Sequence, residues 1–352
     1  MINIPFFKGS PGGSLGIDIG THSIKVVEIS GGIDNLTLEN YGEIFMRDFT
    51  GKSPIKGASG SFLYSNEEIA EALKQILEEA DIKSRRAYFS MPDFVSFFTS
   101  FDLPPMKEEE VGSAVEFHSR QYIPLPISEV ALDWFIDKKE EGKDMKVNLV
   151  AVPNEIIAQY QEIAQLAEVD IVSLESEMFS LVRAYSRNAG EVVAVADIGE
   201  QSTLLSIGKE GKLKTTHSLE VAGNMLIEQL SKSSDIDYDD ARRLIMAYGV
   251  AEESIKKTVR ALAISLFTEI SRIVSSYEKK ENKKIDEIVM AGGFSLLPGV
   301  LGFAKEQMDK RVVTRNCFEG MSYPEALSEE VLYLSSSHVI ALGAALNAIQ
   351  EK

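Results

Sequence analysis

The chain has 352 residues, enough for two or more domains and for a core that needs no disulfide or metal to stabilise it. Its 54 acidic and 36 basic residues give a net charge of -18, which argues against nucleic acid and against direct attachment to an anionic membrane surface. Cys317 is the only cysteine and the four histidines show no metal-ligand spacing, so a disulfide framework, a Cys-based zinc site and a metal-centred enzyme are not expected.

The first residues, MINIPFFKGSPGGS, lack the long apolar run of a signal peptide, and no apolar stretch reaches 18 residues. We therefore expect a cytoplasmic protein. In the first half, Ser65 and Glu68 have the spacing of a capping box that begins a helix. The predicted strands there are 15–20, 23–30, 36–47, 87–92, 94–104, 130–136 and 146–153, and the predicted helices are 65–80, 107–122, 154–167 and 177–188.

The second half begins with an apolar strand that bends and resumes, over 192–208. A long amphipathic helix is predicted within 254–280. A buried strand then leads through Gly292-Gly293 to the start of a helix, and the chain finishes on a helix of small residues at 336–350.

A bend at 18–23, Asp-Ile-Gly-Thr-His-Ser, separates the first two strands. A plain hairpin needs only two or three turn residues. This bend instead gathers a carboxylate, a glycine, two hydroxyls and then Lys25, a set that suits a phosphate and its metal ion. The structural alternative is an ordinary turn, because Asp bonds its own backbone and Gly accepts positive φ.

The bend at 197–203, Asp-Ile-Gly-Glu-Gln-Ser-Thr, repeats the same logic about 180 residues later, which indicates duplicated halves facing one cleft. The sequence contains neither a P-loop nor a GxGxxG pattern. Each bend alone, and the glycine pair alone, is compatible with a purely structural role. The informative feature is the order of the three: a hairpin with an acid and a lysine, a hairpin with an acid, then strand–Gly-Gly–helix.

This trio resembles the actin-like ATPase superfamily, in which two facing hairpins grip the phosphates and a Gly-Gly loop lies against the adenosine. The resemblance implies an α/β actin-like fold that binds ATP and Mg²⁺. Lys25 would meet phosphate charge, and Asp18 and Asp197 would hold Mg²⁺ through its waters. The nucleotide-binding residues that it implies are Gly20, Thr21, His22, Ser23, Lys25, Gly199, Glu200, Gln201, Ser202, Gly223, Asn224, Arg242, Gly292, Gly293 and Phe294.

Residues 103–136, LPPMKEEEVGSAVEFHSRQYIPLPISEVALDWFI, closely resemble the inserted subdomain of the PilM family of type IV pilus assembly proteins, and the resemblance extends from Leu15 to Ala348. It implies two facing domains with an inserted 1C (SHS2-type) subdomain, and connecting helices at 176–185 and 338–349. The layout that it implies is an N-terminal extension at 1–14, subdomain 1A at 15–84, 154–190 and 336–352, subdomain 1C at 85–153, subdomain 2A at 191–225 and 285–335, and subdomain 2B at 226–284.

The chain departs from the family's pattern on the side of the base. Arg242 and Ile245 stand where the family has the Glu and Lys of an Ala-Glu-x-x-Lys pattern, and Leu226 replaces a hydroxyl. Phe294 follows the glycine pair, where the family favours a small residue, and its ring could stack on adenine or fill its space. A nucleotide-free, degenerate actin-like scaffold is therefore an alternative to ATP binding.

The resemblance implies a scaffold of the inner-membrane assembly complex that is at most a weak ATPase, with no catalytic residue identified. The implied partners are the N-terminal cytoplasmic tail of PilN, which in the family lies between subdomains 1A and 1C, and other pilus components of the inner membrane. The membrane would be reached only through the partner. Five apolar residues are expected to line the partner's site, although alternate members of the stretch also suit the 1C core: Phe94, Phe97, Phe98, Phe101 and Leu103.

The opening residues MINIPFF themselves resemble the tail motif of that partner, so they could occupy its groove in cis or in a neighbouring molecule. The sequence leaves two other functions to consider. An FtsA-like cell-division protein usually carries a C-terminal linker and an amphipathic membrane helix, whereas this chain stops at Lys352. A small-molecule kinase on the same fold would need a catalytic Asp beyond Asp18 and Asp197, and the sequence identifies none.

Overall fold

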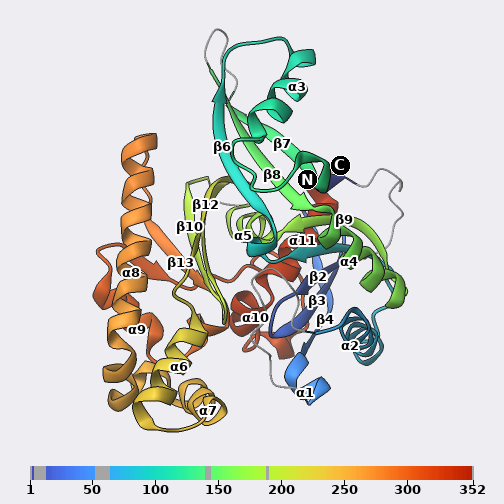
Figure 1. Ribbon diagram of the computed structural model, residues 1–352. Coiled ribbons are helices and arrows are strands. Elements are labelled where there is room, and N and C mark those ends of the chain that lie inside the picture. The colour runs from blue at the N-terminus through green and yellow to red at the C-terminus, as the bar shows by residue number, and fades with distance from the viewer. Residues whose placement is uncertain (1, 4–12, 52–63, 139–143, 188–189, 351–352) are drawn as a thin grey trace. The chain divides into compact units, whose positions relative to one another are not determined.

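The computed structural model describes residues 2–3, 13–51, 64–138, 144–187 and 190–350 (Figure 1). The chain forms two compact units. Unit 1 comprises Met1–Ser30, Glu39–Glu177 and Ala344–Lys352, and unit 2 comprises Gly31–Leu38 and Met178–Gly343. The finer division into four subdomains stays a prediction, and most of the N-terminal extension lies outside the described residues.

Unit 1 is built on a six-stranded mixed sheet with the order β1-β9-β5-β2-β3-β4. Helices α2 and α4 pack against each other, and Asn66 of α2 donates from Nδ2 to Glu162 of α4 at 2.7 Å. The expected capping box at Ser65 and Glu68 is present. The bounds are β1 Ile2–Asn3, β2 Ser14–Ile19, β3 Ser23–Ser30, β4 Thr37–Phe45, β5 Arg86–Met91, β9 Asp170–Ser176, α1 Met46–Thr50, α2 Asn66–Glu79 and α4 Asn154–Leu166.

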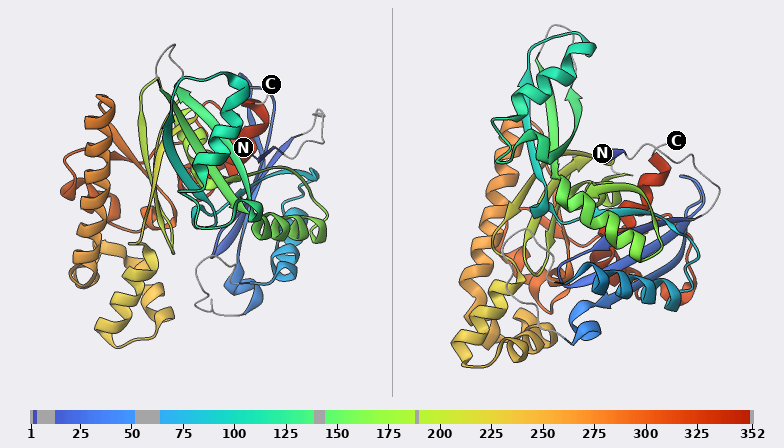
Figure 2. Two further views of the ribbon diagram at one scale, coloured as in Figure 1. Left: turned by 45° about the horizontal axis from the view of Figure 1, so that its top comes forward. Right: turned by 45° about the vertical axis from the view of Figure 1, so that its right-hand side comes forward.

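A second, three-stranded antiparallel sheet in unit 1 has the order β6-β8-β7, with α3 along one of its faces (Figure 2). Val111 and Val115 of α3 pack into the apolar cluster of this sheet. Its elements are β6 Phe97–Leu103, α3 Glu108–Ser119, β7 Val130–Lys138 and β8 Met145–Pro153. The strand expected at 94–104 begins later than predicted, because Asp93–Val95 form a 3₁₀ turn in which the N–H of Ser96 donates to Asp93.

Unit 2 contains a five-stranded sheet with the order β12-β11-β10-β13-β14. Helix α8, the long helix predicted near 254–280, contributes one apolar face to the core of this unit, and α6 packs against α7 and α8. The elements are β10 Val193–Ile198, β11 Thr203–Lys209, β12 Lys212–Leu219, β13 Glu287–Ala291, β14 Arg311–Val313, α5 Glu177–Ser186, α6 Gly223–Ser234, α7 Tyr238–Tyr248, α8 Glu253–Glu281, α9 Val300–Gln307 and α10 Val331–Ser337.

The last expected helix, 336–350, is two helices in the structure. Helix α10 ends at Ser337 and α11, Val339–Gln350, starts after His338, with a bend of 84° between them. The unit assignment of the chain changes within α11 and at the start of α5. Among the described residues no single helix has the length and apolarity needed to cross a membrane, whereas α10 with residues 339–349 reaches both as a bent pair.

Candidate functional site

The first predicted bend is a hairpin between the antiparallel strands β2 and β3, as expected. The N–H of Gly20 donates to the carbonyl of Ser23 at 3.1 Å and closes the turn. Ser23 is buried and donates from Oγ to Glu43 of β4 at 2.8 Å. The Lys25 ammonium lies 3.6 Å from the same Glu43 carboxylate. Lys25 therefore has an acidic partner, Glu43, that sequence spacing did not identify.

Asp18 is the last acidic residue before this turn and lies directly opposite Lys25 in the strand register. Its side chain is only 5% exposed, and this burial raises its pKa from 3.8 to about 6. The Lys25 charge opposes the rise and the Glu43 charge adds to it. The carboxyl also helps raise the pKa of the buried Tyr160, whose main cause is its own burial. Burial thus removes water from the Asp18 carboxyl, and a nearby cation would stabilise its ionised form.

The other two predicted residues of this turn, Thr21 and His22, are half-buried. The His22 ring meets Phe45 edge-on, with the ring centroids 5.7 Å apart, and the His22 carbonyl accepts from the N–H of Met46. The hydrogen bond from Met46 to His22 therefore joins the start of α1 to the hairpin turn. These contacts involve β4 and α1, which lie about 20 residues beyond the turn in sequence.

The second predicted bend is also a hairpin, between β10 and β11 in unit 2. The N–H of Gly199 donates to the carbonyl of Ser202 at 3.0 Å. The hairpin backbone is bonded in turn to the start of α6, because the N–H groups of Gly223 and Asn224 donate to the carbonyls of Gly199 and Glu200 at 3.0 and 2.7 Å. Backbone hydrogen bonds thus join five predicted residues of unit 2, Gly199, Glu200, Ser202, Gly223 and Asn224. Gln201, at the tip of the turn, is exposed.

Glu200 is the charged centre of this second hairpin. The Arg242 guanidinium of α7 lies 3.7 Å from its carboxylate, and the Tyr238 hydroxyl donates to it at 3.3 Å. Burial, followed by the Glu200 charge, raises the pKa of Tyr238. Arg242 is one of the predicted nucleotide-binding residues. Tyr238 is not, because no spacing rule relates a residue at the start of α7 to a carboxylate nearly 40 residues earlier. Ile245, on the same helix, is buried in the core.

The glycine pair follows β13, and Gly292 passes close to the second hairpin. Gly292 has φ +84°, and a Cβ there would collide with the carbonyl oxygen of Ile198 and the carboxylate of Asp197. Glycine is therefore required at 292 on two grounds, while Gly293 has open space around it. The helix expected to start here is a short 3₁₀ turn, and the α-helix begins only at Val300, after Pro298 and Gly299.

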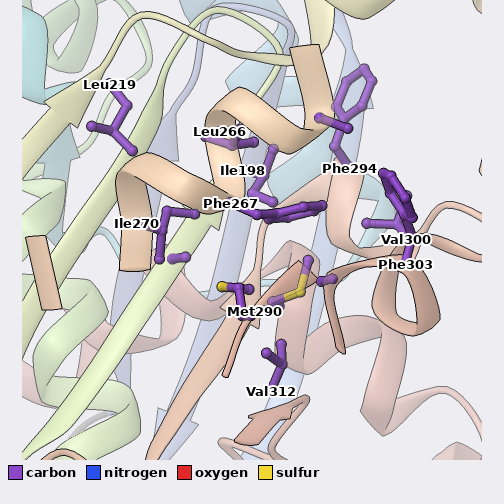
Figure 3. Close-up of a cluster of buried hydrophobic side chains, with 14 of the residues drawn as sticks. Ile198, Leu219, Leu266, Phe267, Ile270, Met290, Phe294, Val300, Phe303 and Val312 are labelled. Carbon is purple, nitrogen blue, oxygen red and sulfur yellow. The ribbon is translucent and has the colours of Figure 1, made fainter. Parts of the chain in front are cut away.

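Phe294 is buried in the hydrophobic core of unit 2 (Figure 3). Its ring lies so close to Gly223 that a side chain at 223 would overlap it. Figure 3 draws it in one cluster with Ile198, Phe267 and Phe303. The ring therefore packs into the apolar core of unit 2, and its role toward adenine, stacking or filling its space, stays a prediction.

The predicted partner-binding residues separate into two groups by burial. Leu103 is fully buried and Phe101 is nearly so, stacked on Tyr122 with ring centroids 5.3 Å apart. Phe94 is 39% exposed, and Phe97 and Phe98 are half-buried. Only the second group has surface that a partner could contact directly.

Each hairpin, taken by itself, carries donor groups of the kinds that a magnesium nucleotide uses. Asp18 and Asp197 supply carboxylate oxygens, the ligands that Mg²⁺ prefers, and Lys25 supplies an ammonium group suited to phosphate. In the described part of the chain, no three or more His, Cys, Asp or Glu side chains cluster so as to hold a metal on their own. A Mg²⁺ ion at either carboxylate would therefore take further ligands from a nucleotide and from water.

Comparison with known proteins identifies the family. A family profile described as "Type IV pilus assembly protein PilM" matches residues 16–349. The chain belongs to the PilM family. The structure of a PilM–PilN type IV pilus biogenesis complex matches with a TM-score of 0.83, 23% identity, and coverage of 97% of this chain and 99% of that chain.

More distant structures share the fold. Ethanolamine utilization protein EutJ from Carboxydothermus hydrogenoformans matches with 15% identity and a TM-score of 0.57 over 97% of this chain and 92% of that chain. MreB5 of Spiroplasma citri, in a structure bound to ADP, matches with 13% identity and a TM-score of 0.50 over 91% and 97%. The predicted mixed α/β actin-like ATPase fold of this PilM-family chain is therefore confirmed.

A curated relative, cell division protein FtsA of Staphylococcus epidermidis, is 20% identical over 269 residues, which cover 67% of this chain and 54% of that protein. The chain thus spans about half the length of the curated relatives it matches. The FtsA alternative from the sequence accordingly reflects a distant relationship, and the family match places the chain in the PilM family.

Proposed function

We propose that this chain is a cytoplasmic, Mg-ATP-binding scaffold of the type IV pilus inner-membrane complex, held at the membrane by a peptide of its partner PilN. The observation that carries the nucleotide part is the β2–β3 hairpin, where the buried Asp18 lies opposite Lys25. Family membership supports the assembly role. We do not assign a catalytic residue, and any ATPase activity is expected to be weak.

In this proposal Lys25 and the backbone N–H groups of the two turns bind phosphate oxygens, while Asp18 and Asp197 orient the waters of Mg²⁺. When bound, Mg-ATP supplies negative phosphate charge and a divalent cation. The phosphate competes with the Glu43 carboxylate, which lies 3.6 Å from the Lys25 ammonium. The cation compensates the desolvated Asp18 and lowers the pKa of this carboxyl, so metal and nucleotide are expected to bind together.

The nucleotide part is tested by thermal unfolding with and without Mg-ATP. A ligand at a hundred times its Kd stabilises the folded state by about 2.7 kcal/mol. We expect a clear rise of Tm with Mg-ATP and a smaller rise with ATP in EDTA. An unchanged Tm at millimolar nucleotide would favour the nucleotide-free scaffold, for which the buried Phe294 and Ile245 offer a physical reason.

The partner part follows from the PilM–PilN complex that this chain resembles. We propose that the cytoplasmic tail of PilN binds in extended form where the six-stranded and three-stranded sheets of unit 1 meet, between the proposed subdomains 1A and 1C. An extended peptide gains main-chain hydrogen bonds at a strand edge and specificity from apolar pockets. Phe94, Phe97 and Phe98 have the accessible apolar surface for such pockets, whereas Phe101 and Leu103 support them from the core.

Fluorescence anisotropy of a labelled PilN tail peptide tests this assignment. We expect Phe94→Ala to weaken binding several-fold, because it removes apolar area at the proposed site. Phe117→Ala is the matched control, since Phe117 is a 69% exposed phenylalanine on α3. Binding that is lost equally in both variants, or absent from the wild type, would contradict the proposed site.

A further inference from the structure

The N-terminal residues Ile2–Asn3 form β1, which pairs antiparallel with β9 at the outer edge of the six-stranded sheet. Ile2 lies opposite Leu174 and Asn3 lies opposite Ser173. Strand β1 also contacts β7 of the three-stranded sheet. The first residues of the chain therefore sit at the junction of the two sheets of unit 1, on the edge of β9 that would otherwise lack a neighbouring strand.

Strand β9 is bonded to helix α11 through side chains. Asn347 of α11 is fully buried and donates from Nδ2 to Ser173 Oγ at 3.3 Å and to Glu175 Oε2 at 3.4 Å. Ser173 and Leu174 are themselves buried. Backbone N–H and C=O groups on a preformed sheet edge are a template for any extended chain. The edge of β9 is thus bonded to α11 through side chains as well as to β1 through its backbone.

The pairing of β1 is short enough to be reversible. Two residues contribute few ladder hydrogen bonds, each worth only about 1 kcal/mol net, and ordering each residue costs a similar amount. In the sequence, Pro5 follows two residues later and has no N–H to donate. Residues 1–7 contain no charged residue, which makes this segment chemically similar to an uncharged apolar peptide from another chain.

We propose that β1 is a built-in competitor: Ile2–Asn3 occupy the strand-addition edge of β9, and an extended, uncharged, apolar peptide of the partner must displace them in order to bind. The inference rests on the proposed peptide-binding function of this junction. The competition regulates peptide binding, because the apparent affinity for the partner falls as β1 occupies the edge for a larger fraction of the time. At 90% occupancy the reduction is about tenfold.

Hydrogen exchange tests the occupancy without any partner. Exchange is measured by mass spectrometry on residues 170–176 in the full chain, in a deletion of residues 1–12, in Ile2→Pro/Asn3→Pro and in the matched Ile2→Ala/Asn3→Ala. We expect faster exchange in the deletion, which removes the β1 carbonyls that accept from β9 N–H groups. We also expect it in the proline variant, which removes the β1 N–H donors and so releases the strand. The alanine variant keeps both kinds of group and should exchange like the wild type. Equal exchange in all four proteins would overturn the proposal.

Peptide binding tests the competition and separates it from the partner assignment. Labelled MINIPFF and a labelled PilN tail peptide are titrated into the full chain and the deletion. We expect both peptides to bind the deletion more tightly than the full chain, about twofold if β1 occupies the edge half of the time and about tenfold at 90% occupancy. If the PilN peptide binds both proteins equally, the competition is wrong and the partner assignment stands. If only MINIPFF binds, and only to the deletion, occupancy of the edge stands and PilN is the wrong partner.

Discussion

The hairpin that joins β2 to β3 and the hairpin that joins β10 to β11 share a turn and differ in the source of their charges. Each strand ends on Asp-Ile and is followed by a glycine, and in each turn the glycine N–H donates to the carbonyl three residues later. The residue opposite Asp18 is Lys25, whereas the residue opposite Asp197 is the buried Leu204. The first hairpin therefore carries its own cation, and the second does not.

The cation beside the second hairpin comes from a helix that lies outside the hairpin. Arg242 of α7 pairs with Glu200, next to a glycine that is bonded to the start of α6. The local sequence therefore determines the turn, whereas the charges around the turn depend on which elements pack beside it. This difference predicts four effects of decreasing size.

The largest effect is expected at the backbone contact that only the second hairpin makes. Gly292→Ala combines a strained positive φ with a collision against the Ile198 carbonyl, so we expect the free energy of unfolding to fall by about 3 kcal/mol or more. Gly293→Ala meets open space and is the matched control, with a change below about 1 kcal/mol. Circular dichroism in urea measures both, and similar losses would show that the contact is not selective.

The first hairpin is expected to become more stable when its buried charge is removed. The folded state raises the pKa of Asp18 from 3.8 to about 6, so the folded state loses stability relative to the unfolded chain as pH rises through this window. Asp18→Asn cannot ionise and should gain about 2 to 3 kcal/mol at pH 7 and almost nothing near pH 4. Asp197→Asn, whose carboxyl is half-buried, should change much less. A gain for Asp18→Asn that is independent of pH would refute the assigned cause.

Nucleotide affinity should distinguish the cation of the first hairpin from its carboxylate. Lys25→Ala removes charge at the phosphates and is expected to weaken ATP binding about tenfold, equivalent to 1.4 kcal/mol, with or without Mg²⁺. Asp18→Ala removes support for the hydrated ion and should matter only with Mg²⁺. Isothermal titration in Mg²⁺ and in EDTA measures both. Equal losses in EDTA would contradict these roles.

The smallest effect is expected for the ion pair of the second hairpin. Arg242 and Glu200 are both partly exposed at 3.7 Å, and such pairs are worth about 1 kcal/mol or less. A double-mutant cycle with Arg242→Ala and Glu200→Gln should give a coupling energy in that range that decreases with added salt. A coupling well above it would mean that the second hairpin depends on its cation as strongly as the first.

The family, the fold class and both hairpins could be predicted from the sequence, because the strands, their bends and their glycines are local patterns repeated in order. The capping box at Ser65 was equally local and is confirmed. The subdomain boundaries, the nucleotide residues and the partner site stay predictions. The helix break at His338 escaped sequence reasoning, since small and apolar residues continue on both sides of it.

Tertiary structure alone decided how the candidate residues are used. Glu43 and Tyr238 join the hairpins from 18 to 38 residues away, so no periodicity links them to the acids or cations that they contact. Phe294 could have faced a ligand or the core, and packing against Gly223 decided for the core. Ile2–Asn3 became an edge strand only because β9 offered an edge. Local sequence sets backbone geometry through short-range sterics, whereas burial and charge pairing are properties of neighbours that the folded chain brings together.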